Sequence, residues 1–414
     1  MKKVFLLSFL LLSMGLSAAS DGRFVRVSGK DLIQPNGEKL FIQGTNLGNW
    51  LNPEGYMFGF SRTNSAWMID LMLRQLVGPD EASFFWQAFK ESYITRDDIL
   101  FIRRQGANTI RLPFNYRLFT SEDYMGMTDN TGEGFRLIDN VVSWCREAGL
   151  FLILDMHDCP GGQTGDNIDD SYGYPWLFRS ERSQRLFCDI WQQIARRYQD
   201  EPVILGYELM NEPIAHYFKD SEEMKQLLQP LYKRAVAAIR EVDTNHVIIL
   251  GGAHWNSHFY MFDDWTFDDN IMYSCHRYGG PATADAIRDY IDFRDKTGLP
   301  MFMGELGHNT IQWQEDFVRA MKENDIGYTF WPYKMVSTGS SMMGIIRPEQ
   351  WDSIVVKFAE APRGTYQEIR DARPDQEQAR QLLRQFLDNS RFVRCEPQEA
   401  YIRSMGLDSM KKEE

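Results

Sequence analysis

Two glutamates, Glu212 and Glu305, closely follow short apolar runs at 203–210 and 300–303. Carboxylates are costly to bury without partners, so both are expected at a partly buried mouth. Two carboxyl groups in one cleft push their pKa values apart, leaving one protonated and one ionised. Hydrolysis of a glycosidic bond needs this division, because an acid protonates the leaving oxygen while a carboxylate attacks the anomeric carbon. From position alone, a structural ion pair with Arg or Lys is the alternative for each glutamate.

Like the two glutamates, several other polar and aromatic residues stand at the end of an apolar run or just after it. A single one would mean little, because a lone histidine after a strand is usually a satisfied core residue. Repetition along most of the chain indicates a site, since a plain scaffold does not need it. These residues are Arg111, Asp155, His157, Asp158, Asn211, His254, Trp255, His276, Tyr278, Trp331 and Tyr333.

The elements that would position these residues alternate between buried-type strands and helices. Continuous apolar strands separated by helices predict a parallel sheet covered on both faces. Eight repeats of this unit predict an α/β fold, a closed (β/α)8 TIM barrel whose strand ends converge on one face. The predicted strands are 39–48, 107–114, 151–155, 203–210, 246–251, 271–275, 300–303 and 327–331. The predicted helices are 134–149, 182–198, 221–242, 283–296 and 311–324, with Pro230 expected to kink or split the third.

The remaining segments are assigned to the two ends of the barrel. Residues 24–42 predict an N-terminal β-hairpin around a turn at Pro35–Glu38. The tail after about residue 350 is expected to be a helical extension, clearest at Gln376–Asn389. Because no repeat and no linker is visible, residues 21–414 are expected to form a single catalytic domain.

The first 20 residues have the pattern of a signal peptide. Lys2 and Lys3 precede the apolar stretch 4–16, and small residues follow at 17–20. We therefore expect a secreted or periplasmic protein. The apolar stretch is too short to span a bilayer and no other stretch approaches the roughly 20 apolar residues required, so no membrane span is expected.

The composition limits which kinds of partner the protein can bind. The net charge of −13 and pI of about 5.1 leave no basic footprint for nucleic acid and suit a neutral substrate. We expect a monomer without metal or organic cofactor. The five cysteines have no zinc-site spacing and are interpreted as small buried hydrophobes. A metal-dependent barrel hydrolase is an alternative, because His157, His254 and His276 could serve as metal ligands at strand ends. Loss of activity with a chelator would favour it.

Five stretches resemble signatures of the glycoside hydrolase family 5 barrels. Gly206–Pro213, which contains Asn211-Glu212-Pro213, is similar to the family's fourth strand, and Met303–Gly307 is similar to its seventh. Stretches similar to the first three strands are Gly44–Leu51, Gly106–Pro113 and Leu154–Asp158. An isolated Asn-Glu-Pro would be weak evidence for the family. The ordered set of five stretches from about residue 40 to 335 argues strongly against the alternative that Glu212 and Glu305 are only structural ion-pair partners.

The resemblance implies a retaining glycoside hydrolase with Glu212 as acid/base and Glu305 as nucleophile, their carboxyl groups about 5 Å apart. Arg111 would hold Glu305 ionised and Tyr278 would donate to it. The residues implied to contact sugar are Asn211 at the 2-hydroxyl, His157 and His276 along the subsite, and Trp331 as its floor. Trp255 is either a sugar platform or only a wall.

The substrate class is the least determined feature. The Gly- and Asp-rich stretch Gly161–Gly173 resembles the exo-glucanase-like members more than the mannanases, although a solvated loop is the alternative. We expect cleavage of β-glucosidic bonds in β-glucan poly- or oligosaccharides, with a β-mannan- or glycolipid-directed hydrolase as the runner-up. Aromatic residues from Trp50 to Trp67 could wall one end of a cleft or pack on the barrel. A non-catalytic carbohydrate-binding barrel is disfavoured because both glutamates are present.

Overall fold

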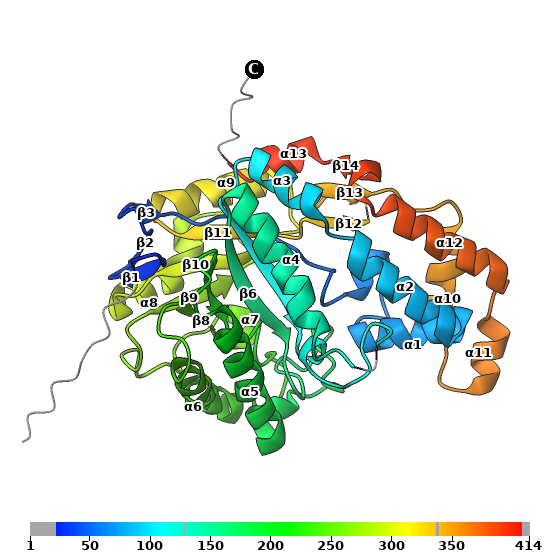
Figure 1. Cartoon of the computed structure of the whole chain (residues 1–414), viewed down its shortest axis with the longest axis horizontal. Helices are drawn as coiled ribbons and strands as arrows, with labels where there is room; N and C mark the ends of the chain where they lie inside the picture. The colour runs from blue at the N-terminus through cyan, green and yellow to red at the C-terminus, as the bar shows by residue number, and fades with distance from the viewer. Residues whose placement is uncertain (1–21, 128, 337–338, 408–414) are drawn as a thin grey trace, which may run out of the picture.

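A computed structural model describes residues 22–127, 129–336 and 339–407. Eight parallel strands close into a barrel, which lies in the left half of the view in Figure 1. Their order around the barrel is β10-β11-β4-β5-β6-β7-β8-β9, with β9 pairing to β10. This confirms the (β/α)8 fold. The strands are β4 (Gln43–Asn46), β5 (Thr109–Asn115), β6 (Phe151–Asp158), β7 (Ile204–Glu208), β8 (Val247–Gly251), β9 (Ile271–His276), β10 (Met301–Gly307) and β11 (Gly327–Trp331).

Helices cover the outside of the barrel, which explains why the strands are apolar on both faces. Each predicted helix is present: α4 (Glu133–Ala148), α5 (Glu181–Tyr198), α6 (Ser221–Arg240), α8 (Arg288–Thr297) and α9 (Ile311–Glu323). Helix α4 ends at Gly149, whose φ of 67° is the left-handed conformation common after a helix. The expected split at Pro230 is wrong, because α6 continues through it as one helix. Pro230 is exposed, so water can satisfy the carbonyl that its missing N–H leaves free.

The N-terminal segment forms a three-stranded antiparallel sheet and not a single hairpin. Its strands are β1 (Arg26–Ser28), β2 (Asp31–Ile33) and β3 (Lys39–Leu40). The predicted turn at Pro35–Glu38 joins β2 to β3, and Gly29, with φ of 59°, reverses the chain before β2. Val25, Leu32 and Leu40 from this region pack in one cluster with residues near the beginnings of the barrel strands. The sheet therefore closes the barrel at the end opposite the strand C-termini.

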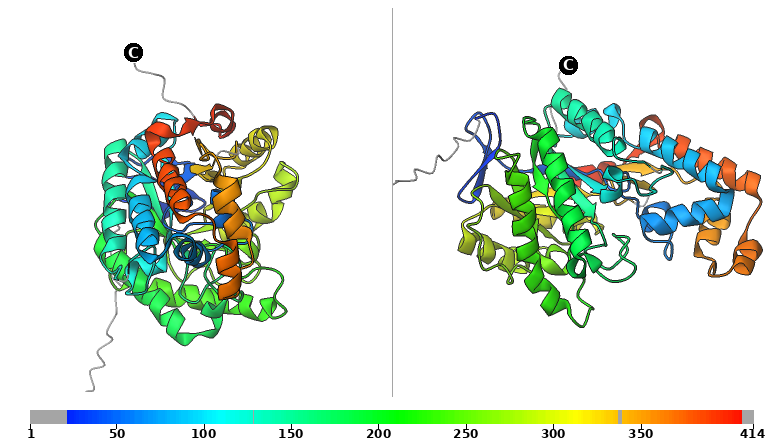
Figure 2. Two further views of the ribbon diagram at one scale, coloured as in Figure 1. Left: turned by 90° about the vertical axis from the view of Figure 1, so that its right-hand side faces the viewer. Right: turned by 60° about the horizontal axis from the view of Figure 1, so that its bottom comes forward.

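Beside the barrel, helices from the N-terminal part of the chain pack against helices from its C-terminal part (Figure 2). The β4–β5 connection contains α1 (Ala66–Val77), α2 (Pro79–Ser92) and α3 (Arg96–Arg104), none of which was predicted. Helix α12 (Gln376–Asn389), predicted with these bounds, packs on α1 and α2, and its Phe386 ring contacts Phe85 of α2. The other C-terminal helices are α10 (Lys357–Glu360), α11 (Tyr366–Ala372) and α13 (Glu399–Ser404). A small unpredicted sheet joins β12 (Lys334–Val336), β13 (Met343–Ile345) and β14 (Glu396–Pro397).

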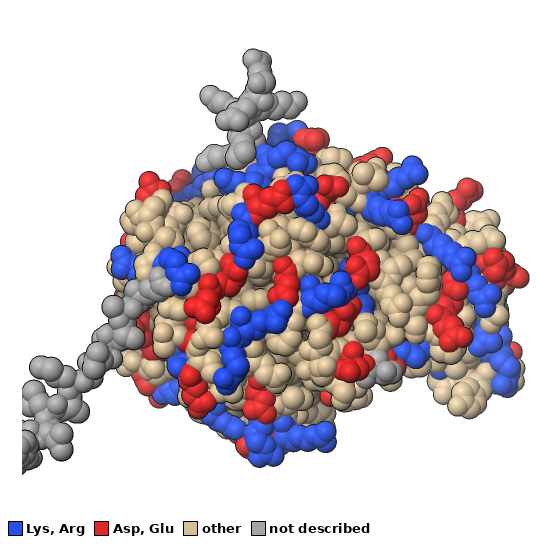
Figure 3. Space-filling view, viewed as in Figure 1, with Lys and Arg blue, Asp and Glu red and all other residues tan. Residues whose placement is uncertain are grey.

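Several expectations concern the chain as a whole. The predicted signal peptide, residues 1–20, lies outside the described residues. Within the described residues, no helix is long and apolar enough to cross a membrane. All five cysteines are buried with free thiols, as expected for small apolar side chains. The face shown in Figure 3 carries Lys and Arg interleaved with Asp and Glu, with no broad basic patch.

Candidate active site

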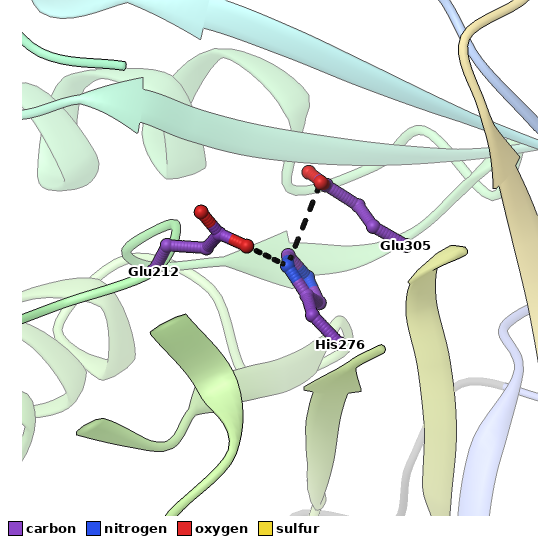
Figure 4. A group of neighbouring side chains, drawn as sticks. All are labelled: Glu212, His276 and Glu305. Carbon is purple, nitrogen blue, oxygen red and sulfur yellow. Dashed lines mark hydrogen bonds and ion pairs between the residues drawn. The ribbon is translucent and has the colours of Figure 1, made fainter. Parts of the chain in front are cut away.

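Glu212 and Glu305 face each other across His276 (Figure 4). Glu305 lies in β10, whereas Glu212 follows β7 with a left-handed φ of 44°. One oxygen of each carboxyl group and one ring nitrogen of His276 all lie within 4.8 Å of one another. His276 Nδ1 is 2.8 Å from Glu212 Oε1 and 3.6 Å from Glu305 Oε2. The barrel therefore brings the predicted carboxylate pair into one small region at the C-terminal ends of its strands.

Arg111 occupies the centre of the charge network beneath this pair. Its fully buried guanidinium donates from Nη1 to Glu305 Oε1 at 2.7 Å and from Nε to Glu208 Oε2 at 2.6 Å. A third carboxylate, Asp155 Oδ2, lies 3.0 Å from Nη2. Burial lowers the pKa of Arg111, but the three carboxylates outweigh burial and raise it well above its ordinary value. Three buried carboxyl groups therefore share one permanent cation.

The two glutamates have different surroundings. Burial raises the pKa of Glu212 to about 7, with Arg111 opposing the rise. Glu305 accepts hydrogen bonds from the Arg111 guanidinium at Oε1 and from the Tyr278 hydroxyl at Oε2, the second at 2.6 Å. Both contacts stabilise an ionised carboxylate. Glu212 instead accepts from His276, so the two carboxyl groups have different partners.

Two neutral histidines, His157 and His276, form hydrogen bonds with the polar groups around the pair. His157 Nδ1 lies 2.7 Å from Asp155 Oδ2, and its Nε2 lies 3.3 Å from the Asn211 amide nitrogen. Since an amide nitrogen only donates, His157 Nε2 accepts and Nδ1 carries the proton. Burial lowers the pKa of His157 to about 3 and that of His276 to about 4, so both rings are neutral near pH 7. By the same logic His276 accepts from the Asn256 amide at 3.1 Å and donates to Glu212.

A cavity of about 520 Å³ lies above this network. The residues to which the family resemblance gave a role all line it except Arg111 and Asn211, which lie beneath it, buried. Of the other strand-end residues, Asp155, Asp158 and Tyr333 are buried and do not line it. The ring of Trp331 stacks on His157, with centroids 5.1 Å apart and an interplanar angle of 2°. Trp255 reaches the wall within a strained segment, where it and its two neighbours have φ between 53° and 56°. His254, one of the strand-end residues without an implied role, also lines the cavity.

Comparison with known proteins agrees with this architecture. The sequence matches the family Cellulase (glycosyl hydrolase family 5) over residues 75–336, more than half of the chain. This chain belongs to glycosyl hydrolase family 5. Its Glu212 and Glu305, with the strands that carry them, lie inside the matched region.

Three relatives have hydrolase names. A β-xylosidase from Phanerodontia chrysosporium is 31% identical over 306 residues, covering 69% of this chain and 61% of the relative. Endoglucanase C from Acetivibrio thermocellus is 27% identical, covering 59% of this chain and 85% of the relative. A probable glucan 1,3-β-glucosidase A from Aspergillus fumigatus is 27% identical, covering 63% and 65%. The chain thus spans less than two thirds of the length of two of these relatives.

Solved structures share the fold. The crystal structure of an endogalactoceramidase superposes with a TM-score of 0.57 at 18% identity, covering 76% of this chain and 75% of that one. At that identity the likeness concerns the barrel alone.

Sequence reasoning missed Glu54 of this family 5 site, and it placed Tyr56 only within an aromatic stretch that could wall a cleft. Glu54 is 3% exposed and lines the cavity, and within the described residues its Oε1 has no hydrogen-bond partner. Burial, with repulsion from Glu305 and Glu212, raises its pKa well above the ordinary value. Tyr56 accepts a hydrogen bond from Trp331 Nε1 at 2.6 Å. Both lie in the loop after β4, where no apolar periodicity marks a strand end.

The site also bears on the metal-dependent alternative. Within the described part of the chain, Glu212, His276 and Glu305 are the one group whose atoms lie close enough to hold a metal ion. His157 and His254 do not belong to it, so the histidines that raised this alternative do not form one ligand set. The buried Arg111 cation, 2.7 Å from Glu305, would repel a metal ion there.

Proposed function

We propose that this family 5 enzyme is a retaining glycoside hydrolase that cleaves β-glucosidic bonds in β-glucans by double displacement. The observation that carries the proposal is the short separation of the two carboxyl groups, with oxygens within 4.8 Å. Retaining enzymes keep their carboxyl groups about 5–5.5 Å apart, whereas inverting enzymes need about 6.5–9.5 Å to admit a water.

The mechanism follows from the two environments. Glu305 attacks the anomeric carbon while Glu212, protonated because burial raises its pKa to about 7, gives its proton to the departing oxygen. The bond from the anomeric carbon to the leaving oxygen breaks as the ester to Glu305 forms. Glu212, now a carboxylate, then takes a proton from water, which displaces Glu305 and regenerates both groups.

Neighbouring residues hold this pair in position. Arg111 and Tyr278 orient the two oxygens of Glu305, and His276 orients Glu212. Asn211 Oδ1 accepts from Arg111 Nη2 at 2.8 Å, and the Asn211 amide donates one N–H to His157. The second N–H is left for the sugar 2-hydroxyl. Trp331 would support the sugar ring from below.

A β-glucan is the favoured substrate because the endoglucanase and glucan 1,3-β-glucosidase relatives carry names of that class. The loop at Gly161–Gly173, singled out in the sequence, contributes Asp166, Asn167 and Ile168 to the cavity wall. A mannan- or glycolipid-directed enzyme is the alternative. We also propose export by the N-terminal segment, testable by sequencing the N-terminus of mature protein.

The decisive experiment is hydrolysis of laminarin, mixed-linkage glucan, carboxymethylcellulose, pustulan and mannan by the purified enzyme. Glu212→Gln and Glu305→Gln run beside it, and proton NMR of the first product reports the anomeric configuration. Cleavage of one β-glucan with retained configuration, lost in both variants, is the expected result. Cleavage of mannan alone would show that the substrate is a mannan and not a β-glucan. Full activity of Glu305→Gln would overturn the mechanism.

A further inference from the structure

A second cavity, of about 220 Å³, lies beside the catalytic one. It forms between the N-terminal end of α1 and the loop at 165–173, and Asp166 and Asn167 line both cavities. The two half-buried side chains therefore form a common wall between the two cavities.

The loop that separates the cavities is held from both sides. Near the catalytic site, the Thr164 hydroxyl donates to the Glu212 carbonyl at 2.7 Å. Near α1, Asp170 accepts from the Trp67 backbone N–H at 3.0 Å and pairs with Arg117 Nη1 at 2.5 Å. Asp169 closes the loop on itself by accepting the N–H groups of Thr164 and Gly165. The second cavity is thus preformed, which reduces the entropy lost when a ligand binds.

Two aromatic rings stand at this cavity with much of their surface in water. Trp67 is 49% exposed and Tyr172 is 80% exposed, and their rings meet edge to face at 6.4 Å. Tyr172 also has a φ of 58°, a left-handed conformation that a bulky side chain rarely adopts. Folding gains little from a strained, solvated ring, and such strain often accompanies a binding role.

The remaining lining is polar and suits sugar hydroxyls. Asn64, Asp166 and Asn167 offer amide and carboxylate groups. An apolar ring surface combined with a few polar groups is the usual composition of a small-ligand site.

We propose that this second cavity is a distal subsite, which binds a pyranose unit of the same β-linked chain whose scissile bond lies between Glu212 and Glu305. The inference rests on the proposed function and adds to it the direction of the substrate. The chain leaves the catalytic cavity past Asp166 and Asn167 and reaches Trp67 and Tyr172.

The test compares chain lengths on the purified enzyme. The values of kcat/KM are measured for a disaccharide and a hexasaccharide of the cleaved glucan in Trp67→Ala and Tyr172→Asn. Asn tolerates the left-handed backbone, so the second variant removes the ring without adding strain. Each variant should lose about 10-fold more activity on the hexasaccharide than on the disaccharide, the size expected for one aromatic contact. Tyr366→Ala, on α11 and 82% exposed, is the control and should match the wild type on both.

A binding measurement keeps the two proposals apart. Calorimetry of hexasaccharide in a Glu305→Gln background should show about 10-fold weaker affinity with Trp67→Ala added. Equal losses on both chain lengths, or unchanged affinity, would overturn the distal subsite while leaving the hydrolase intact. If the wild type hydrolyses neither oligosaccharide the proposed function fails, and the calorimetric comparison still decides whether the cavity binds sugar.

Discussion

Arg111 Nη1 lies 2.7 Å from Glu305 Oε1, inside a site where the arginine is fully buried. The same guanidinium bonds Glu208 and Asp155 and holds the Asn211 amide oxygen. One side chain thus positions the candidate nucleophile and supplies the positive charge that three buried carboxyl groups share. A planar fork with five donors can do this, whereas a lysine ammonium cannot.

Arg111→Lys should therefore fold but lose at least about 100-fold in kcat/KM, because the ammonium cannot hold Glu305 in place. Arg111→Met should also lose about 3–5 kcal/mol in the free energy of unfolding, since it leaves buried carboxylates without a cation. Kinetics and denaturant unfolding measure the two effects. Near wild-type activity of Arg111→Lys would show that charge alone is sufficient.

The pKa of Glu212 predicts the alkaline limb of the activity profile. Because the protonated form is the acid, kcat/KM should fall as the pH rises through about 7. Glu212→Gln should remove this limb and lose most of its activity on a natural glucan. It should lose far less on an aryl glycoside with an acidic phenol, whose leaving group needs no proton. An unchanged alkaline limb in the variant would assign it to another group.

Tyr278→Phe removes the hydroxyl that donates to Glu305 Oε2 at 2.6 Å. A hydrogen bond to a charged group contributes about 1.5–3 kcal/mol, so kcat/KM should fall about 10- to 100-fold. Tyr273→Phe is the matched control: Tyr273 is buried in β9, and its hydroxyl has no partner among the described residues. Equal losses in the two variants would mean that the Glu305 contact contributes nothing specific.

Glu54 makes a prediction about stability. Its folded-state pKa is raised well above the ordinary 4.5 mainly by burial, so the folded protein keeps the proton longer than the unfolded chain. Below about pH 4.5 Glu54 is protonated in both states and does not affect the free energy of unfolding. Between that pH and the higher folded-state pKa, it lowers the free energy of unfolding by about 1.4 kcal/mol per pH unit. Glu54→Gln should become progressively more stable than the wild type over that window. Parallel unfolding curves at pH 4 and 7 would contradict the assignment.

Chelation tests the role of the Glu212, His276 and Glu305 cluster. If the carboxyl groups act as acid and nucleophile, dialysis against EDTA should leave kcat unchanged. Loss of activity that added Zn²⁺ or Mn²⁺ restores would instead indicate a metal ion bound between them.

Local patterns in the sequence determined the elements that matter most. The apolar runs predicted the barrel strands, and α12 was predicted with its observed bounds. Because parallel strands of a barrel end on one face, the position of Glu212 and Glu305 after two such runs was enough to predict their meeting. That inference depends only on periodicity and on the family signatures.

Tertiary structure decided what periodicity does not encode. Glu54 lies in a loop, so only folding brings its carboxyl group near Glu305 and raises its pKa. The packing of α12 on α2 joins segments almost three hundred residues apart, through rings such as Phe85 and Phe386. The ends of the barrel strands could be predicted from the sequence because the same strand-and-helix pattern recurs along the chain. The cavity walls and the carboxyl cluster around Arg111 form only when folding brings distant side chains together, and burial then shifts the pKa values of these groups.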